Sequence, residues 1–419
     1  MPRRPIEIAV LGASHESADF ATRERLADAL TPRAVAATVS GLVDEVVTIT
    51  TCDRTEVVLA CRDSRALAAA EDALRDLAGT GGGDIRVLRG RAAIRHVIRV
   101  SMGLDALILG EHEIQGQVGH AWRSAKRAGT AGPVMAALFQ RALHTAGRAR
   151  AEVGLGRGRT SIASLAFEHV LPALSGRDGV EVVIVGADPA ARGLGRRLVE
   201  AVSGTVWATG PGGEAARFAR DIGAERLALD GAADVLQRCS LLVGAAPLPA
   251  AVAAALRAPH RAGPLLIMDM CMPRSVPPDI GSLPGIRIDT LDDLRPLARR
   301  ADDVRRRDAA AAARIASEGT AWMTDWLAGR EAVSAIRGVL DDVEALRRRE
   351  LDRAIRHDDT PETVERLQRL SRRLAAAFAH APATRLRYSD DPDTDAAVLR
   401  RLFGPVTPST LDESADGTR

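Results

Sequence analysis

Apolar residues recur along this chain at two spacings, one typical of strands and one typical of helices. In the first third of the sequence, short β-branched runs predict strands at residues 6–11 and 46–50. Apolar positions three and four residues apart predict helices over residues 22–30, 32–42, 64–77, 91–109, 114–127 and 139–153. Together these elements predict one α+β domain over residues 1–155.

A more regular rhythm begins at residue 156. A predicted helix over residues 156–175 leads into apolar runs that predict strands at residues 180–185, 205–208, 241–244 and 265–270. The first of these runs is apolar except for one glutamate, as expected for a parallel strand that is covered on both faces. Helical stretches separate the strands, so we predict a doubly wound, Rossmann-like dinucleotide-binding domain over residues 156–293.

The pattern changes again near residue 297, where Ala, Arg, Asp and Glu dominate and apolar residues keep a helical spacing. This predicts long, exposed helices, and Thr360-Pro361 provides the N-cap and first residue of one more. Such helices bury their apolar stripe in an intramolecular bundle or against a second copy of the chain. We favour the second alternative, a helical dimerisation domain over residues 294–388 and a homodimer. The Asp-, Pro-, Ser- and Thr-rich segment 389–419 is predicted to be disordered.

The fold class is therefore α/β, with an N-terminal α+β domain, a Rossmann-like domain and a C-terminal helical domain joined by a long helix. Net charge is +2 and aromatic residues are 3%, so neither a global positive field nor base stacking marks a nucleic-acid-binding protein. The four cysteines show no CxxC spacing, which predicts no metal site and suits a reducing cytoplasm. No apolar run reaches the roughly 20 residues that span a bilayer, and we expect a cytoplasmic protein without membrane contact.

The segment Thr51-Cys52-Asp53-Arg54-Thr55-Glu56 carries the candidate chemistry. It follows a predicted strand, and strand ends hold reactive side chains rigidly while a loop leaves them accessible. The positive charge of Arg54 would favour the thiolate of Cys52 and make it a nucleophile. The alternative is that Cys52 is a small buried core residue and that Arg54 is an ion-pair partner of Glu56.

Several further motifs accompany this segment in a fixed order. They are Gly12-Ala13-Ser14-His15 with Arg23-Glu24-Arg25-Leu26, residues 103–111 with Gly116-Gln117-Val118, residues 269–274 with 291–294, and residues 380–382 with 385–387. In this order they resemble the glutamyl-tRNA reductase family over about residues 6–388. The resemblance implies NADPH-dependent reduction of glutamyl-tRNA to glutamate-1-semialdehyde, the first step of tetrapyrrole (porphyrin) biosynthesis from glutamate. It also implies glutamate-1-semialdehyde aminomutase as a partner that receives the aldehyde.

The resemblance assigns roles to single residues. Cys52 would attack the ester carbonyl of glutamyl-tRNA and form a thioester, which hydride from NADPH would reduce. Arg54 would bind the substrate carboxylate, and His96 would give acid–base help, although without the resemblance His96 could equally be a plain helix-face residue. The other substrate-binding positions are Thr51, Asp53, Ala106, Glu111, His112, Glu113 and Gln117. The cofactor-binding turn comprises Gly186, Ala187, Asp188, Pro189, Ala190 and Ala191.

The chain departs from the family pattern at several of these positions. Ala106 replaces a serine, and Asp53 and Glu113 replace neutral amides, which adds negative charge beside an anionic substrate. Asp188 replaces the glycine that lets the backbone approach a pyrophosphate, and Pro189 removes an N–H donor. The stretch 208–212 carries no charge where the family has an arginine for NADP. Two other hypotheses therefore stay open, a paralogue that uses Cys52 for acyl transfer without reduction, and a non-catalytic scaffold.

Overall fold

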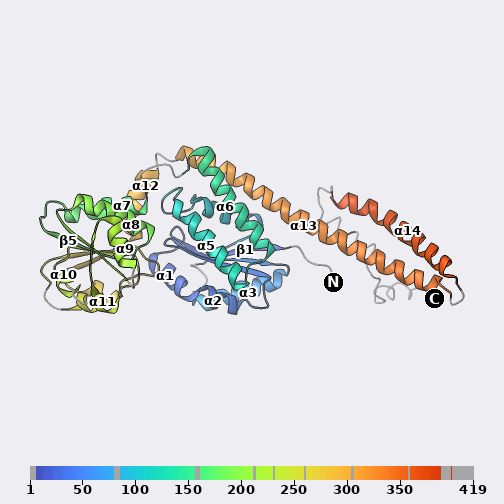
Figure 1. Cartoon of the computed structure of the whole chain (residues 1–419), viewed down its shortest axis with the longest axis horizontal. Helices are drawn as coiled ribbons and strands as arrows, with labels where there is room; N and C mark the ends of the chain where they lie inside the picture. The colour runs from blue at the N-terminus through green and yellow to red at the C-terminus, as the bar shows by residue number, and fades with distance from the viewer. Residues whose placement is uncertain are drawn as a thin grey trace, which may run out of the picture. The chain divides into compact units, whose positions relative to one another are not determined.

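The computed structural model of the protein describes residues 6–79, 85–155, 161–210, 214–229, 232–258, 261–302, 306–356, 359–387 and 398. The chain forms two compact units (Figure 1). One extends over Glu7–Thr320 and contains two β-sheets, one of four strands and one of six. The other comprises Met1–Ile6 and Ala321–Arg419, and its described elements are helices.

The smaller sheet is antiparallel, with strand order β2-β3-β1-β4. Its strands are β1 (Glu7–Ser14), β2 (Glu45–Thr50), β3 (Arg54–Cys61) and β4 (Arg86–Arg89). One face packs on α1 (Phe20–Ala29), α2 (Pro32–Thr38) and α3 (Ser64–Ala78). The other face packs on α4 (Gly90–Met102), α5 (His112–Ala128) and α6 (Pro133–Val153).

The alternation of side chains along β3 places its charged residues on one face of the sheet. Val57 and Leu59 belong to the apolar core under α1, α2 and α3, so Arg54 and Glu56 point to the side of α4. Gly12 of β1 pairs with Glu56, and a Cβ atom at Gly12 would lie only 2.2 Å from the Thr55 backbone oxygen. This close approach requires glycine and brings the polar start of β3 against β1.

The larger sheet is parallel, with strand order β10-β9-β8-β5-β6-β7. Its strands are β5 (Val180–Val185), β6 (Gly204–Thr209), β7 (Glu225–Arg226), β8 (Leu241–Gly244), β9 (Leu265–Asp269) and β10 (Ile286–Thr290). The core on one face includes residues of α7 (Ile162–Leu174), α8 (Pro189–Ala201) and α9 (Glu214–Ile222), and the core on the other includes α10 (Ala232–Arg238) and α11 (Ala250–Arg257). The doubly wound sheet confirms the predicted fold class, and its strand order reverses direction between β5 and β8, where such sheets bind ligands.

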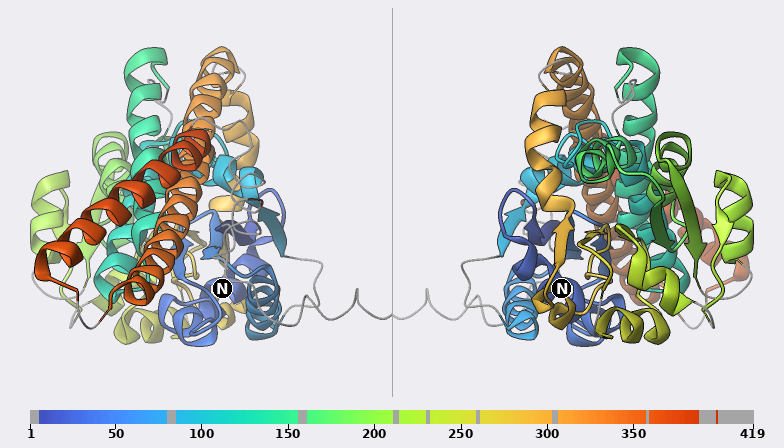
Figure 2. Two further views of the ribbon diagram at one scale, coloured as in Figure 1. Left: turned by 90° about the vertical axis from the view of Figure 1, so that its right-hand side faces the viewer. Right: turned by 90° about the vertical axis from the view of Figure 1, so that its left-hand side faces the viewer.

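The remaining helices follow the long helical pattern of the sequence. They are α12 (Arg295–Asp302), α13 (Arg306–Ala354) and α14 (Pro361–Arg387). The hydroxyl of Thr360 accepts from the Thr363 N–H at 3.3 Å, as expected for the cap of α14. In the second unit α13 and α14 lie side by side, joined by a hydrogen bond from Arg347 to Ser371 (Figure 2). Among the helices of the described ranges, none is long and apolar enough to cross a membrane.

Around the Cys52 turn and the segment after α4, the structure differs from the sequence prediction. The helix predicted over residues 91–109 ends at Met102, because Gly103 adopts φ +73° and ends it in the left-handed conformation. The segment that follows the strand at 46–50 is a tight turn, and β3 begins already at Arg54. The predicted disordered segment 389–419 lies outside the described residues except for residue 398, and the boundaries at residues 155, 293 and 388 remain predictions.

Candidate functional site

The turn between β2 and β3 presents Cys52 and is fixed by its own side chains. The Thr51 hydroxyl donates to Asp53 Oδ1 at 2.6 Å, and the Thr51 N–H donates to the Arg54 backbone oxygen at 2.9 Å. The other Asp53 oxygen accepts from the Leu107 N–H at 3.1 Å, which ties the turn to the loop after α4. Thr51 and Asp53 are both buried. They therefore act in this structure as supports for the turn.

Arg54 is completely buried and has acceptors on three sides. Its Nε lies 3.4 Å from Asp53 Oδ1, its Nη1 lies 3.4 Å from Glu56 Oε1, and its Nη2 donates to the Asp105 backbone oxygen. Burial alone would lower the pKa of Arg54, but the Asp53 and Glu56 carboxylates outweigh it and raise that pKa. The guanidinium is thus charged, and its charge is already matched by groups of the protein.

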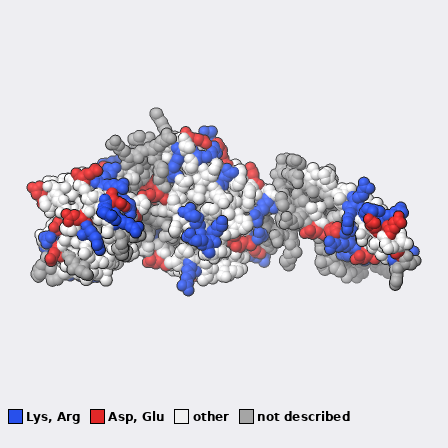
Figure 3. Space-filling model, in the orientation of Figure 1, with Lys and Arg blue, Asp and Glu red and all other residues white. Residues whose placement is uncertain are grey.

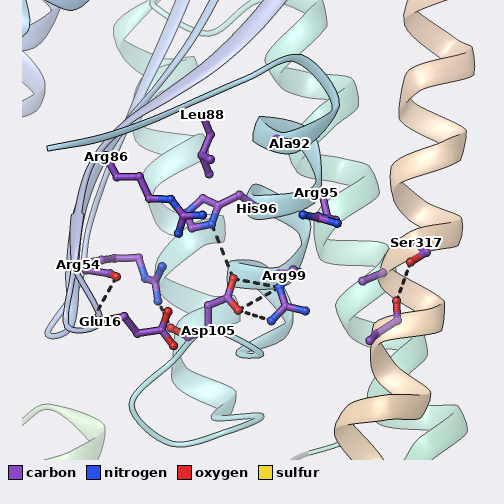
Figure 4. A pocket seen from close by; sticks show the side chains of 13 residues that line it. Glu16, Arg54, Arg86, Leu88, Ala92, Arg95, His96, Arg99, Asp105 and Ser317 are labelled. Atoms are coloured by element: carbon purple, nitrogen blue, oxygen red, sulfur yellow. Dashed lines mark hydrogen bonds and ion pairs between the residues drawn. The ribbon is translucent and has the colours of Figure 1, made fainter.

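His96 of α4 lies between two carboxylates. Its Nε2 is 2.8 Å from Glu56 Oε1, and its Nδ1 is 3.7 Å from Asp105 Oδ2. Asp105 also accepts from Arg99 Nε at 3.0 Å (Figure 4). Burial would raise the pKa of Glu56, yet Arg54 and His96 hold it below its ordinary value. Residues from β3, α4 and the following loop thus form one charged network.

A cavity of about 440 Å³ opens beside this network (Figure 4). It lies over the face of the smaller sheet that carries α4, and polar side chains dominate its lining. The lining residues are Ser14, Glu16, Arg54, Arg86, Leu88, Ala92, Arg95, His96, Arg99, Asp105, Ala313, Ala316 and Ser317. Cys52 is not among the residues that line this cavity.

Cys52 is half-buried and packs against the apolar core of the parallel sheet. Its burial raises the pKa of the thiol well above the ordinary value, and the carboxylates of Asp53, Glu111 and Glu113 raise it further. The sequence predicted instead that Arg54 would favour the thiolate. That prediction is wrong for this structure, because Arg54 is neutralised by its own acceptors and acidic residues surround the thiol.

The other predicted substrate-binding residues are spread along the loop after α4 and the start of α5. Ala106 is half-buried, and Glu111 is buried at the N-cap of α5. Glu113 follows in the first turn, where burial and then the charge of Asp188 raise its pKa. Among the described residues, Gln117 Oε1 is buried without a hydrogen-bond partner, so it could accept from a ligand. The side chain of His112 lies outside the described part of the structure.

Helix α1 connects the Cys52 turn to the parallel sheet, a role that the sequence did not reveal. Arg23 Nη1 donates to the Cys52 backbone oxygen at 3.3 Å, and its Nη2 lies 2.5 Å from Asp292 Oδ1. The next residue, Glu24, accepts from both the backbone N–H and the Nε of Arg274 at 2.8 Å. These residues belong to the motifs noted above, but only the fold shows that they meet.

The turn after β5 has a backbone that suits a dinucleotide and a side chain that does not. Gly186 adopts φ +103°, and a Cβ atom there would lie 2.7 Å from the Ala245 backbone at the end of β8. Asp188 caps α8, where its Oδ1 accepts from the Ala191 N–H at 2.6 Å, and Pro189 supplies no N–H. A pyrophosphate bound at this helix start would need the same donors. The Asp188 carboxylate therefore already engages an N–H donor that a pyrophosphate at this turn would use.

The other described residues of this turn, and Gly210 at the end of the next strand, carry no charged side chain that could attract or repel a nucleotide. Ala190 and Ala191 are buried in the first turn of α8, and Ala187 packs against the core of the parallel sheet. Gly210 follows β6 without a side chain, and Pro211 lies outside the described residues. Among the described residues of the turn, Asp188 alone brings a negative charge against a pyrophosphate, and Pro189 removes one donor.

Fold and site together define a protein in which a cysteine-bearing turn on an α+β domain packs against a dinucleotide-binding type of sheet. Residues 11–153 match the family model of the glutamyl-tRNA(Glu) reductase N-terminal domain, and residues 311–405 match that of its dimerisation domain. The chain is 31% identical to the glutamyl-tRNA reductase of Rubrobacter xylanophilus, with 94% of this chain and 96% of the relative covered. It belongs to the glutamyl-tRNA reductase family.

Other relatives and a solved structure agree with this assignment. The Salinispora tropica glutamyl-tRNA reductase is 32% identical, with 99% of this chain and 94% of the relative covered. The structure of the Methanopyrus kandleri glutamyl-tRNA reductase has a TM-score of 0.53 at 27% identity, with 96% of this chain and 98% of that chain covered. The likeness therefore extends over nearly the full length of both chains.

Proposed function

We propose that this protein reduces glutamyl-tRNA to glutamate-1-semialdehyde with NADPH, the first step of porphyrin biosynthesis from glutamate. The observation that carries the proposal is the position of Cys52, held in a fixed turn against the dinucleotide-binding type of sheet. Membership of the family favours this function over acyl transfer without reduction and over a non-catalytic scaffold. The role of each residue below is part of the proposal.

Cys52 is the nucleophile. Its sulfur bonds to the carbonyl carbon of the glutamyl ester while the bond to the tRNA ribose oxygen breaks, and the thiol proton ends on that oxygen. A thiol with a raised pKa is mostly protonated at neutral pH, so proton removal belongs to the attack itself. The chemistry that NADPH would supply when bound is a hydride, which with one proton converts the thioester to the aldehyde and restores the thiol.

The polar residues around the cavity position the substrate. His96, held by Glu56 and Asp105, is placed for proton transfer within the cavity. Gln117 offers a buried carbonyl oxygen without a partner in the described chain, which suits the α-ammonium group of a glutamyl ester. Arg54 binds substrate only if it gives up one of its present acceptors, so we assign it first to holding the turn.

We further propose a cytoplasmic homodimer that passes its aldehyde to glutamate-1-semialdehyde aminomutase. The match of residues 311–405 to a dimerisation domain supports the dimer. A reactive aldehyde gains from direct transfer to the next enzyme, which supports an aminomutase partner on chemical grounds.

A single-turnover reaction with labelled glutamyl-tRNA, with and without NADPH, tests the function. We expect the aldehyde only with NADPH, and we expect Cys52→Ser to abolish loss of the glutamyl group from tRNA, since an alcohol is a weaker nucleophile. Cys61→Ser is the matched control, because Cys61 is a buried thiol at the far end of β3. Loss of the glutamyl group at equal rates in the wild type and in Cys52→Ser would contradict the proposed role of Cys52.

A further inference from the structure

The cavity beside His96 has an excess of positive charge. Its lining contains the arginines Arg54, Arg86, Arg95 and Arg99, against the carboxylates of Glu16 and Asp105. Over the face shown in Figure 3, by contrast, basic and acidic side chains are mixed. An excess of arginine in one cavity of a nearly neutral chain points to an anionic ligand.

The four arginines divide into two pairs with different surroundings. Arg54 and Arg99 are both engaged, Arg54 with Asp53 and Glu56, and Arg99 with Asp105. Arg86 and Arg95 are exposed and form no ion pair within the described ranges of the chain. Glu16 forms no ion pair within these ranges either, so the charge that remains for a ligand is that of Arg86 and Arg95, less the single negative charge of Glu16.

These two arginines enter the cavity from separate, rigid elements. Arg86 lies on β4 opposite Gly12, on the same face of the sheet as Glu56, and Arg95 precedes His96 on α4 (Figure 4). The small side chains of Ala313 and Ala316 line α13 on the same cavity and leave room there. The cavity can thus hold an anionic group and a bulky neighbour of that group.

We propose that Arg86 and Arg95 bind phosphate groups at the 3′ end of the tRNA and so guide its aminoacylated end toward the active site. This inference rests on the proposed function, since it takes glutamyl-tRNA as the substrate. Exposed guanidinium groups suit phosphodiesters, which stay partly hydrated when bound, and arginine binds phosphate oxygens with paired hydrogen bonds. A glutamyl carboxylate held for specificity needs a more enclosed position than these two side chains offer.

Salt dependence of tRNA binding gives the sharpest test. Each arginine that neutralises a phosphate of single-stranded RNA adds about 0.7 to the slope of log affinity against log salt concentration. The probe is tRNA(Glu) that carries no amino acid. For the double variant Arg86→Met/Arg95→Met we expect the magnitude of that slope to fall by about 1.4. Affinity at low salt should fall about fivefold to tenfold. Fluorescence anisotropy of the full-length protein over a salt series measures both quantities.

Arg33→Met is the matched control, since Arg33 is an exposed arginine on α2, across the smaller sheet from α4. It should leave the slope unchanged. An unchanged slope in the double variant would overturn the proposal. If that variant also attacked glutaminyl-tRNA as readily as glutamyl-tRNA, the two arginines would instead bind the substrate carboxylate. tRNA that carries no amino acid can bind but cannot react. The binding measurement therefore tests the two arginines even if the proposed reductase reaction is not observed.

Discussion

At the start of α8, the Asp188 carboxylate accepts hydrogen bonds from backbone N–H groups that would bind a phosphate in a dinucleotide site. It accepts from the helix N–H groups, and burial raises its pKa while these hydrogen bonds lower it. Negative charge gathers around it, since Asp188 raises the pKa of Glu113 and, after burial and Asp269, contributes to a pKa of about 12 for Cys271. A pyrophosphate would have to displace one carboxylate and approach others.

Replacement of this one residue should therefore strengthen cofactor binding. In Asp188→Gly the donors at the start of α8 become available and the local negative charge falls, so we expect the Kd for NADPH to fall about tenfold. Glycine is tolerated at an N-cap with a loss of only a few tenths of a kcal/mol, so the fold should persist. Titration of NADPH fluorescence measures the change.

Asp188→Asn separates charge from space at the same position. Asparagine keeps the cap and the bulk of the side chain but removes the charge, so its Kd should lie between those of the wild type and Asp188→Gly. Equal Kd values in all three proteins would show that another feature of the turn sets cofactor affinity.

At the scale of elements, the start of α6 depends on a side chain from β2. Glu45 accepts from the N–H groups of Gly132, Val134 and Met135 at 2.9, 3.0 and 2.7 Å. A Cβ atom at Gly132 would lie 2.7 Å from Glu45 Oε1, so glycine makes room for the carboxylate. A strand of the smaller sheet thereby fixes a helix on the face that carries the cavity.

Removal of this carboxylate should destabilise the protein without touching the site. Glu45→Ala leaves three N–H groups, two of them buried, without their acceptor, and we expect the free energy of unfolding to fall by about 2–4 kcal/mol. Urea denaturation followed by circular dichroism measures it. Glu225→Ala, which changes an exposed glutamate on β7, should change it by less than about 0.5 kcal/mol. Equal effects of the two substitutions would contradict the capping role.

The sequence predicted some elements well and others poorly, for physical reasons. The strands Val180–Val185 and Leu241–Gly244 have the predicted bounds, because strands buried on both faces are continuous apolar runs. β3 was missed because it begins with Arg54 and Glu56, which are charged yet buried. Their partners come from α4 and the loop beyond it, so no local pattern could reveal that a strand starts there.

The same limit applies to the candidate site. The sequence singled out Cys52, Arg54 and His96, and the structure places Arg54 and His96 in one network around Glu56. The alternative that Arg54 pairs with Glu56 is confirmed, but the sequence could not show its further acceptor, the backbone oxygen of Asp105, about fifty residues away. Arg86 and Arg95 belong to none of the motifs that the sequence revealed. Only the structure shows that they line a cavity without forming an ion pair in the described ranges.

At the scale of the whole molecule, the second unit exposes large apolar side chains to solvent, which is unfavourable in a monomer. Leu370 and Leu374, one helical turn apart on α14, are 56% and 62% exposed. A row of exposed leucines on a helix is typical of an interface with another chain. Because the dimerisation-domain match covers this helix, we expect a second copy of the protein to bury these side chains.

Light scattering on the full-length protein tests this interface, and the wild type should show twice the mass of one chain. Leu370→Asp/Leu374→Asp should give the monomer mass, because the interface would have to bury charges without partners. Arg372→Asp places the same residue on the opposite side of α14 and should leave the dimer intact. Every residue assigned to the site lies within Glu7–Thr320, so the monomeric variant should still remove the glutamyl group from tRNA. A variant that is monomeric and inactive would show that the site needs the second chain.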